Sequence, residues 1–445
     1  MRIAILSLVL AAPLAHAALE EEIHAKRLEQ LEIAKGITNA GPDVYFRVAE
    51  LWFDEARFFL LKEDRAARET ATKNAVATCR ELMDRFPRYE RMDEVLASMG
   101  HALLDLDDDA RAVVAFKRLV EKYPNSAHAS EAWFRLAENY FAKANGRGDW
   151  LKRARAAYVE AQKSGAEPLT SDAKFKEAFC AFNLQDFTEA SLGFEDVARS
   201  GQPRAKEARS AYVMVFVRSG GQAGAARAAL TRITTGVEER RALEAQLAAR
   251  YHEDGFDRAA AVVWQALIAE RPDAPEAFAY QTSIIDAVMR VGNKDLTTQQ
   301  VRKLVQLSSS LPASVDRSGA EELLAKLATN WHTECRRTKE EGCLRFPSAV
   351  YESYLTIFPA TARAYELHFF FAELLFETNE FGRAAAEYRA VVDRDAACRT
   401  SGACKPGKYL EPAALGEIHA REQLALRDGS GHGGRASKRM FYASR

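Results

Sequence analysis

The chain has 445 residues, of which 48% are apolar and 28% charged, and its formal net charge is −1. This composition is typical of a folded globular protein and excludes a disordered chain, while the length is too great for one compact core. The near-zero charge excludes a global field that would attract nucleic acid or an anionic membrane, so neither is expected as a partner.

The N-terminus has the pattern of a secretory signal. Arg2 precedes an apolar run over residues 3–14, and Ala15 and Ala17 stand two residues apart at its end. A basic start, a short apolar segment and small residues with this spacing predict a signal peptide over residues 1–17. The alternative, a retained membrane anchor, needs about 20 apolar residues, more than this run has. Because residue 18 is Ala and not a lipidated Cys, we expect an exported, periplasmic protein without a lipid anchor or a membrane span.

The segment 18–41 is expected to form an N-terminal amphipathic helix and a linker. Gly41 and Pro42, followed by Asp43, then mark the start of another helix. From there the sequence predicts helix after helix, because alternating apolar segments rich in Val, Ile and Thr are missing. The expected fold class is therefore all-α.

The helical region contains a repeat. A small residue is followed by a second small residue 12 positions later, by an aromatic residue 16 positions later and by Pro about 24 positions later. The matching sets are Gly100–Ala112–Phe116–Pro124, Ala178–Ala190–Phe194–Pro203, Ala248–Ala260–Trp264–Pro272 and Ala372–Ala384–Tyr388, the last without Pro. Small residues suit the point where two helices cross, and Pro ends the second helix. This spacing resembles the tetratricopeptide repeat of about 34 residues, which implies a superhelical solenoid of antiparallel helix pairs.

The repeat divides the chain into segments of different regularity. We expect a tetratricopeptide array over 42–274 and divergent helical repeats over 275–360, with long helices near 275–290, 296–310 and 316–338. A C-terminal repeat and a partial repeat should occupy 361–426. The Gly-rich, basic segment 427–445 is expected to be a disordered tail.

The cysteines predict disulfides and no redox motif. Export permits disulfides, and each of two pairs brackets a short polar segment: Cys335 with Cys343, and Cys398 with Cys404. Cys79 and Cys180 lie within helical patterns and are interpreted as isolated apolar fillers. No Cys-x-x-Cys motif is present.

No local signature of catalysis is found. Phosphate loops, Gly-x-Ser-x-Gly elbows and His-Glu-x-x-His helices are absent from the sequence. His332 and Cys335 could bind a metal with Cys343, but a disulfide is the preferred interpretation. His252 is expected to be exposed or to cap a helix. The sequence thus predicts a protein that is not an enzyme and has no metal or cofactor.

A row of aromatic and acidic residues is the main candidate for partner binding. Four segments share the pattern Phe-x-x-Ala-(Glu/Phe)-x-x-Phe, which places both outer Phe on one helical face. The resemblance to tetratricopeptide repeats implies that these positions line the concave groove. The candidate residues are Phe46, Glu50, Phe53, Phe134, Glu138, Phe141, Phe175, Phe179, Phe182, Tyr212, Phe369, Glu373 and Phe376. Such a wall suits a peptide that offers apolar anchors and Lys or Arg. The alternative is that these Phe pack against neighbouring helices and meet no ligand.

Individual repeats resemble those of bacterial cell-envelope proteins. The segment 123–126 followed by 131–141 is similar to repeats of the Tol–Pal coordinator, of outer-membrane assembly lipoproteins and of myxobacterial gliding-motility proteins. The resemblance implies a non-catalytic periplasmic scaffold or adaptor that binds other envelope proteins or peptide segments. Two alternatives stay open: a structural homo-oligomer that uses the Phe row for self-association, and an enzyme with a site in 275–360.

Overall fold

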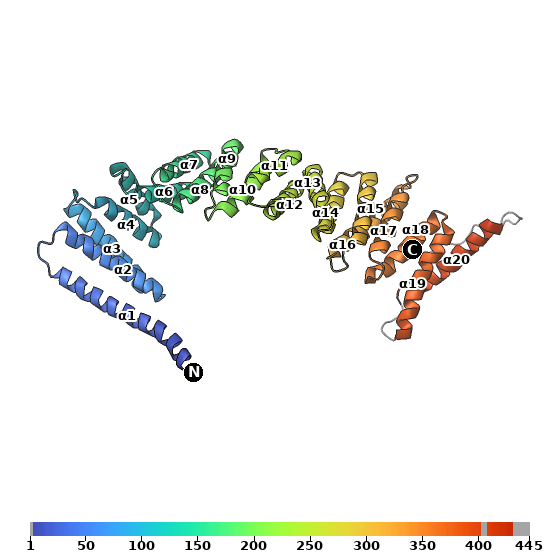
Figure 1. Cartoon of the computed structure of the whole chain (residues 1–445), viewed down its shortest axis with the longest axis horizontal. Helices are drawn as coiled ribbons and strands as arrows, with labels where there is room; N and C mark the ends of the chain where they lie inside the picture. The colour runs from blue at the N-terminus through green and yellow to red at the C-terminus, as the bar shows by residue number, and fades with distance from the viewer. Residues whose placement is uncertain (1–2, 402–406, 430–445) are drawn as a thin grey trace. The chain divides into compact units, whose positions relative to one another are not determined.

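The computed structural model describes residues 3–401 and 407–429, and within these ranges all regular structure is helical (Figure 1). The chain divides into two compact units. Unit 1 consists of residues 1–219 and 232–234, and unit 2 consists of residues 220–231 and 235–445. The expected all-α fold class is confirmed.

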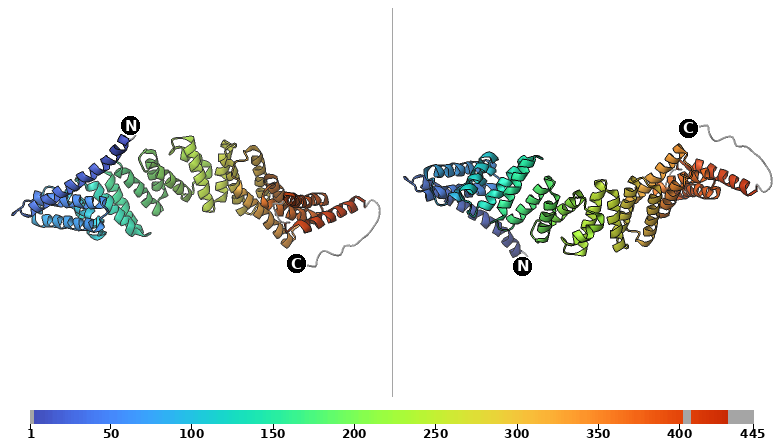
Figure 2. Two further views of the ribbon diagram at one scale, coloured as in Figure 1. Left: turned by 90° about the horizontal axis from the view of Figure 1, so that it is seen from below. Right: turned by 90° about the horizontal axis from the view of Figure 1, so that it is seen from above.

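Unit 1 is a succession of antiparallel helix pairs that follows an N-terminal helix. Its helices are α1 (Ile3–Lys35), α2 (Pro42–Leu61), α3 (Arg65–Arg85), α4 (Met92–Asp105), α5 (Asp109–Lys122), α6 (Ala129–Ala144), α7 (Gly148–Gln162), α8 (Leu169–Asn183), α9 (Phe187–Arg199) and α10 (Ala205–Arg218). Each helix packs against the next one along the chain, as the views of Figure 2 show.

Unit 2 continues with the same kind of pairing. Its elements are a 3₁₀ turn (Ala223–Ala225), α11 (Ala226–Thr231), α12 (Val237–Glu253), α13 (Asp257–Glu270), α14 (Glu276–Arg290), α15 (Lys294–Ser310), α16 (Ser318–Thr338), α17 (Arg345–Ile357), α18 (Ala362–Glu377), α19 (Phe381–Ser401) and α20 (Leu410–Gly429). The three long helices expected within 275–338 are α14, α15 and α16. The expected partial repeat at the end is α20, which packs mainly on α19.

The repeat positions read from the sequence form the core of each pair. Gly100 on α4 faces the Phe116 ring on α5 so closely that a Cβ at Gly100 would lie 2.5 Å from a ring carbon. Ala112 and Phe116 are fully buried, and so are the corresponding residues of the other matching sets. The small residue therefore leaves the space that the aromatic ring occupies between the two helices.

The turn within several pairs has a fixed chemistry. A residue in the left-handed region, such as Asp107 with φ 56°, is followed by an Asp that caps the second helix. The side chain of Asp108 accepts a hydrogen bond from the Arg111 backbone N–H at 3.1 Å. Asp64 and Asp186 cap α3 and α9 in the same way. An Asp at this position satisfies an amide of the first turn that has no partner within the helix.

A polar clasp joins the two ends of many pairs. An acidic residue in the first turn of the first helix bonds to a residue in the last turn of the second helix or beyond its end. The clasps are Asp43 with Tyr89 at 2.9 Å, Asp93 with Ser126 at 2.7 Å, Asp172 with Arg204 at 2.6 Å, Glu238 with Arg271 at 2.6 Å and Glu321 with Tyr354 at 3.0 Å. Apart from the first, the partners lie 32 or 33 positions apart, close to one repeat length.

The described residues begin and end with a helix, α1 and α20. Helix α1 is continuous from Ile3, so it includes most of the segment predicted as a signal peptide. Helix α20 extends to Gly429, and the remainder of the tail expected over 427–445 lies outside the described residues. Among the described helices, none combines the length and the apolar character that crossing a bilayer requires.

Candidate interaction surfaces

The predicted partner-binding residues all lie on first helices of pairs, namely α2, α6, α8, α10 and α18. The structure separates them by burial. Phe46, Phe175 and Tyr212 are buried, whereas the other ten are half-buried. The row is therefore not one uniform surface.

The buried aromatic residues act as joints between successive pairs. The Arg91 guanidinium, from the loop before α4, lies 4.2 Å from the centre of the Phe46 ring. The Arg204 guanidinium, at the start of α10, lies 5.6 Å from the centre of the Phe175 ring. Tyr212 on α10 accepts a hydrogen bond from the Arg232 side chain at 3.1 Å. The two Phe ring faces thus already meet a cation of the same chain, and the Tyr212 hydroxyl is bound by another.

The half-buried aromatic residues of α6 and α8 are better placed to meet a partner. Phe141 lines a hollow of about 370 Å³ together with Leu151 and Asn183. Its only close cation is Lys176, with Nζ 5.8 Å from the ring centre, among the residues that the structure describes. The neighbouring Phe182 contacts the ring of Phe187 at 5.8 Å between centres. Both Phe are partly exposed, and Phe141 also borders a concave surface.

The other aromatic residues of the row pack against residues of neighbouring helices. Phe134 meets Tyr158 edge to face at 5.7 Å, and Phe179 meets the Phe194 ring at 4.9 Å. In unit 2, Phe369 stacks on Tyr409 at 4.6 Å. The remaining two make comparable contacts, Phe53 with the core of α2–α6 and Phe376 with Phe381.

The glutamates of the row are partnered within the chain. Glu138 accepts a hydrogen bond from the Tyr158 hydroxyl and pairs with Lys176 at 3.1 Å. In unit 2, Glu373 accepts a hydrogen bond from the Tyr388 hydroxyl. Burial, reinforced by these carboxylates, holds the pKa of both tyrosines far above the usual range. Glu50 pairs with Arg47 at 3.2 Å. Since each carboxylate has such a partner, the wall attracts a basic ligand less strongly than its sequence suggests.

Residues 99–126, which include the Gly100–Phe116 contact, match the model of the tetratricopeptide repeat. This segment of the chain is a tetratricopeptide repeat. No curated protein matches the sequence.

Solved structures with the same kind of fold are similar to the chain at low sequence identity. The tetratricopeptide-repeat domain of P58(IPK) is 12% identical, with 85% of this chain and 99% of that chain covered and a TM-score of 0.23. A tetratricopeptide-repeat protein of Parabacteroides merdae is 11% identical, with 84% and 98% covered and a TM-score of 0.29. The structure of Naa15/Naa10 bound to HypK-THB is 12% identical, with 91% and 63% covered and a TM-score of 0.35.

Unit 2 contains the disulfide expected between Cys335 and Cys343, whose Cα atoms are 5.7 Å apart. It ties the end of α16 to the loop before α17. The second expected pair cannot be followed, because Cys404 and the side chain of Cys398 lie outside the described residues. Cys79 and Cys180 are buried free thiols, and burial raises the pKa of each to about 12.

Polar clusters between repeats are features that sequence reasoning missed. His252 at the end of α12 is half-buried and lies between Asp257 on α13 and Asp286 on α14, at 2.6 and 2.9 Å. It is therefore not the exposed or capping residue that the sequence predicts. The signal was present, because His252 and Asp286 lie 34 positions apart, one repeat length.

A cluster of larger charge lies between α12 and α13. Arg240 and Glu244, both buried, pair at 2.7 Å, and Arg240 also pairs with Glu270 on α13. Arg227 on α11 reaches the same two glutamates at 3.0 and 2.8 Å. Three helices of unit 2 are thus joined by one network of ion pairs whose members satisfy one another.

The described residues contain no group of three or more His, Cys, Asp or Glu side chains arranged to hold a metal ion. A further hollow lies between α14 and α16, inside the segment 275–360 where an enzyme site was an open alternative. Its polar lining consists of surface carboxylates, one Lys and one Asn, without a paired nucleophile and base.

Proposed function

We propose that the protein is a non-catalytic adaptor of a cell-envelope assembly that binds peptide segments or partner proteins through its first helices. Tetratricopeptide repeats are a fold of protein–protein interaction, and stacked repeats present extended binding surfaces. The observation that carries the proposal is Phe141, a half-buried aromatic ring beside a hollow of about 370 Å³. Together with Phe182 it offers the apolar anchor point that hot spots of interfaces require.

The proposed location is the periplasm, reached through the signal over residues 1–17. The Cys335–Cys343 disulfide supports it, because structural disulfides persist in oxidising compartments. The predicted partners are other envelope proteins, held through apolar anchors with a smaller contribution from Lys or Arg. Mature protein purified from the exported fraction should begin at residue 18 when its N-terminus is sequenced, whereas an N-terminus at residue 1 would contradict the proposed cleavage.

The binding proposal is tested by capture of partners from cross-linked envelopes. The variant Phe141→Ala with Phe182→Ala removes the two anchors, and Val114→Ala with Leu192→Ala removes two exposed apolar side chains from second helices. We expect the first variant to lose a defined set of envelope proteins and the second to keep it. Circular dichroism must show that both are folded. If both folded variants keep every partner, the anchors are not at these positions.

Self-association is a second candidate function. Leu415, Ile418 and Leu426 on α20 are each more than half exposed, although α20 lies at the end of a packed array. A second copy could cover this face, as large exposed apolar side chains favour association. A mass that rises with concentration in light scattering, and that Ile418→Glu returns to the monomer value, would support it. A constant monomer mass would exclude it.

A further inference from the structure

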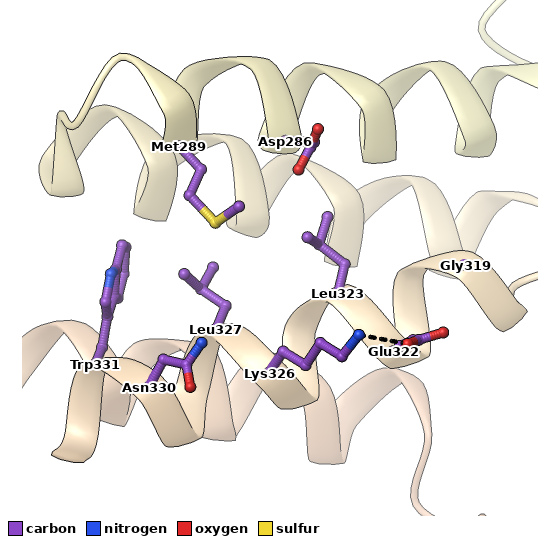
Figure 3. Close-up of a pocket in the computed structure, with 9 residues that line it drawn as sticks. All are labelled: Asp286, Met289, Gly319, Glu322, Leu323, Lys326, Leu327, Asn330 and Trp331. Carbon is purple, nitrogen blue, oxygen red and sulfur yellow. Dashed lines mark hydrogen bonds and ion pairs between the residues drawn. The ribbon is translucent and has the colours of Figure 1, made fainter. Parts of the chain in front are cut away.

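A hollow in unit 2 has an apolar floor and a charged end. It lies between α14 and α16 and has a volume of about 430 Å³. Met289 projects from α14 toward Leu323 and Leu327 of α16, and Trp331 stands at one end (Figure 3). A volume of this size accommodates a large apolar side chain with part of its backbone.

Asp286 lies at the edge of this floor and is held in place by two other residues. His252 Nε2 lies 2.9 Å from Asp286 Oδ2, and an Arg290 guanidinium nitrogen lies 3.4 Å from the same oxygen. The other ring nitrogen of His252 is bound by Asp257 on α13, so the orientation of Asp286 is supported from several helices. The contacts with His252 and Arg290 are both made by Oδ2, and Asp286 is one of the residues that line the hollow.

The rest of the charged rim is adaptable. Glu322 and Lys326 on α16 form an exposed pair one helical turn apart, drawn as a dashed line in Figure 3. Exposed pairs of this spacing contribute only about 0.3–0.5 kcal/mol, so Glu322 can exchange Lys326 for a ligand cation at small cost. The rim therefore provides two carboxylates for an incoming cation and one ammonium that can turn away.

We propose that this hollow is a binding subsite for a peptide segment that carries a large apolar side chain and, within one helical turn, a Lys or Arg. The apolar side chain would cover Met289, Leu323 and Leu327, and the cation would meet the carboxylates of Asp286 and Glu322. The inference rests on the proposed function, but it assigns a site in the divergent segment and uses none of the residues of the Phe row.

Small probes test the chemistry of the site directly. The two probes are phenethylammonium and 3-phenylpropionate, which share the aromatic ring and have opposite charge. Binding to the full mature chain is followed by NMR of methionine methyl groups, with the Met289 signal assigned through Met289→Leu. We expect phenethylammonium to shift the Met289 signal at millimolar concentration and 3-phenylpropionate to leave it unchanged.

Three variants separate the contributions of the rim. Asp286→Asn should weaken the binding of phenethylammonium about tenfold, which is the effect of losing one charge-assisted hydrogen bond. Lys326 lies on the exposed surface, so Lys326→Glu does not threaten folding. This variant should tighten the binding of phenethylammonium about two- to fivefold. Asp295→Asn, an exposed Asp at the start of α15 and outside the hollow, is the matched control and should change nothing.

Equal binding of both probes, or no effect of Lys326→Glu, would overturn the proposal. The outcome is independent of partner capture through Phe141 and Phe182, because the probes report on unit 2 without any protein partner. Failure of the capture experiment with success of the probe experiment would leave this subsite standing and place the adaptor surface elsewhere.

Discussion

The close approach of Gly100 to the Phe116 ring sets a strict requirement on the residue at position 100. Because a Cβ at residue 100 would lie 2.5 Å from a buried ring carbon, a side chain there must displace the ring. Gly is otherwise unfavourable within a helix by about 0.5–1 kcal/mol. Position 100 is therefore Gly because the ring leaves no room for a side chain, although Gly is unfavourable within a helix.

Substitution of Gly100 should reveal that contact. Gly100→Leu is expected to destabilise the protein by about 1–3 kcal/mol, the cost of overpacking a filled core, although Leu is the better helix former. The measurement is the free energy of unfolding in urea. Phe116→Ala destabilises by itself, but the double variant should recover part of the cost of Gly100→Leu. Strict additivity of the two changes would contradict the contact.

We expect the buried thiols of Cys79 and Cys180 to be unreactive toward alkylation in the folded protein. Since burial raises the pKa of Cys79 and of Cys180 to about 12, almost no thiolate is present at pH 8. Iodoacetamide should label neither residue in the folded protein and both after denaturation, as read by mass spectrometry of their peptides. Labelling of either thiol within minutes under native conditions would show that its helix pair opens readily.

Glu131 predicts a pH dependence of stability. A hydrogen bond from His101, helped by Arg135, lowers the pKa of Glu131 to about 2. A lowered pKa stabilises the folded state above the ordinary value of 4.5, and this contribution is lost as the pH falls from 4.5 toward 2. Because Glu131 is partly exposed, the contribution should stay below about 1 kcal/mol.

The measurement is the titration of the Glu131 carboxyl carbon by NMR. In His101→Ala the pKa should return toward the ordinary range, and the stability difference between the two proteins should shrink in acid. An unchanged pKa in the variant would assign the shift to another group.

At the scale of elements, α1 is attached to unit 1 through few contacts, and one residue dominates them. Glu55 on α2 is only 1% exposed, and it pairs with Arg27 at 3.0 Å and His24 at 2.6 Å, both on α1. Leu31 is the one residue of α1 buried among those whose side chains the structure describes. The ion pairs of Glu55, more than an apolar core, therefore hold α1 in place.

Breaking the ion pairs of Glu55 should release α1 and leave the other helices intact. Removing one partner of a buried ion pair costs about 3–5 kcal/mol, so Glu55→Ala should raise amide hydrogen exchange over residues 19–35 by at least roughly tenfold. Glu32→Ala, which removes an exposed pair with Lys35, is the control and should leave exchange unchanged. Faster exchange throughout unit 1 would instead show that Glu55 supports the whole unit.

Sequence reasoning located the elements well because their signals are local. The 12- and 16-residue spacings placed Gly100 against Phe116, and the helix starts at Pro42 and near residues 276, 294 and 318 followed from turn residues and periodicity. The site was harder to predict. Phe53 and Phe141 have the same position in the pattern, but the first packs on the core of its unit while the second borders a hollow. That difference depends on tertiary contacts that no spacing within a helix encodes.

At the scale of the whole molecule, the structure consists of two units built from the same element. Each helix pair buries its small and aromatic positions within itself, and it meets its neighbours through cation–aromatic joints and ion-pair clusters. In such arrays stability is a sum of terms within repeats and between neighbours. Substitutions at partially exposed positions on first helices can therefore change binding without unfolding the chain.

Site-specific photo-cross-linking in cells tests the central claim most directly. A photoreactive phenylalanine analogue placed at residue 141 or 182 should give adducts with the same small set of envelope proteins. The same analogue at residue 114 or 192, on the exposed face of second helices, should give none of them. Adducts that arise only from residues 114 and 192, or from none of the four positions, would contradict the account.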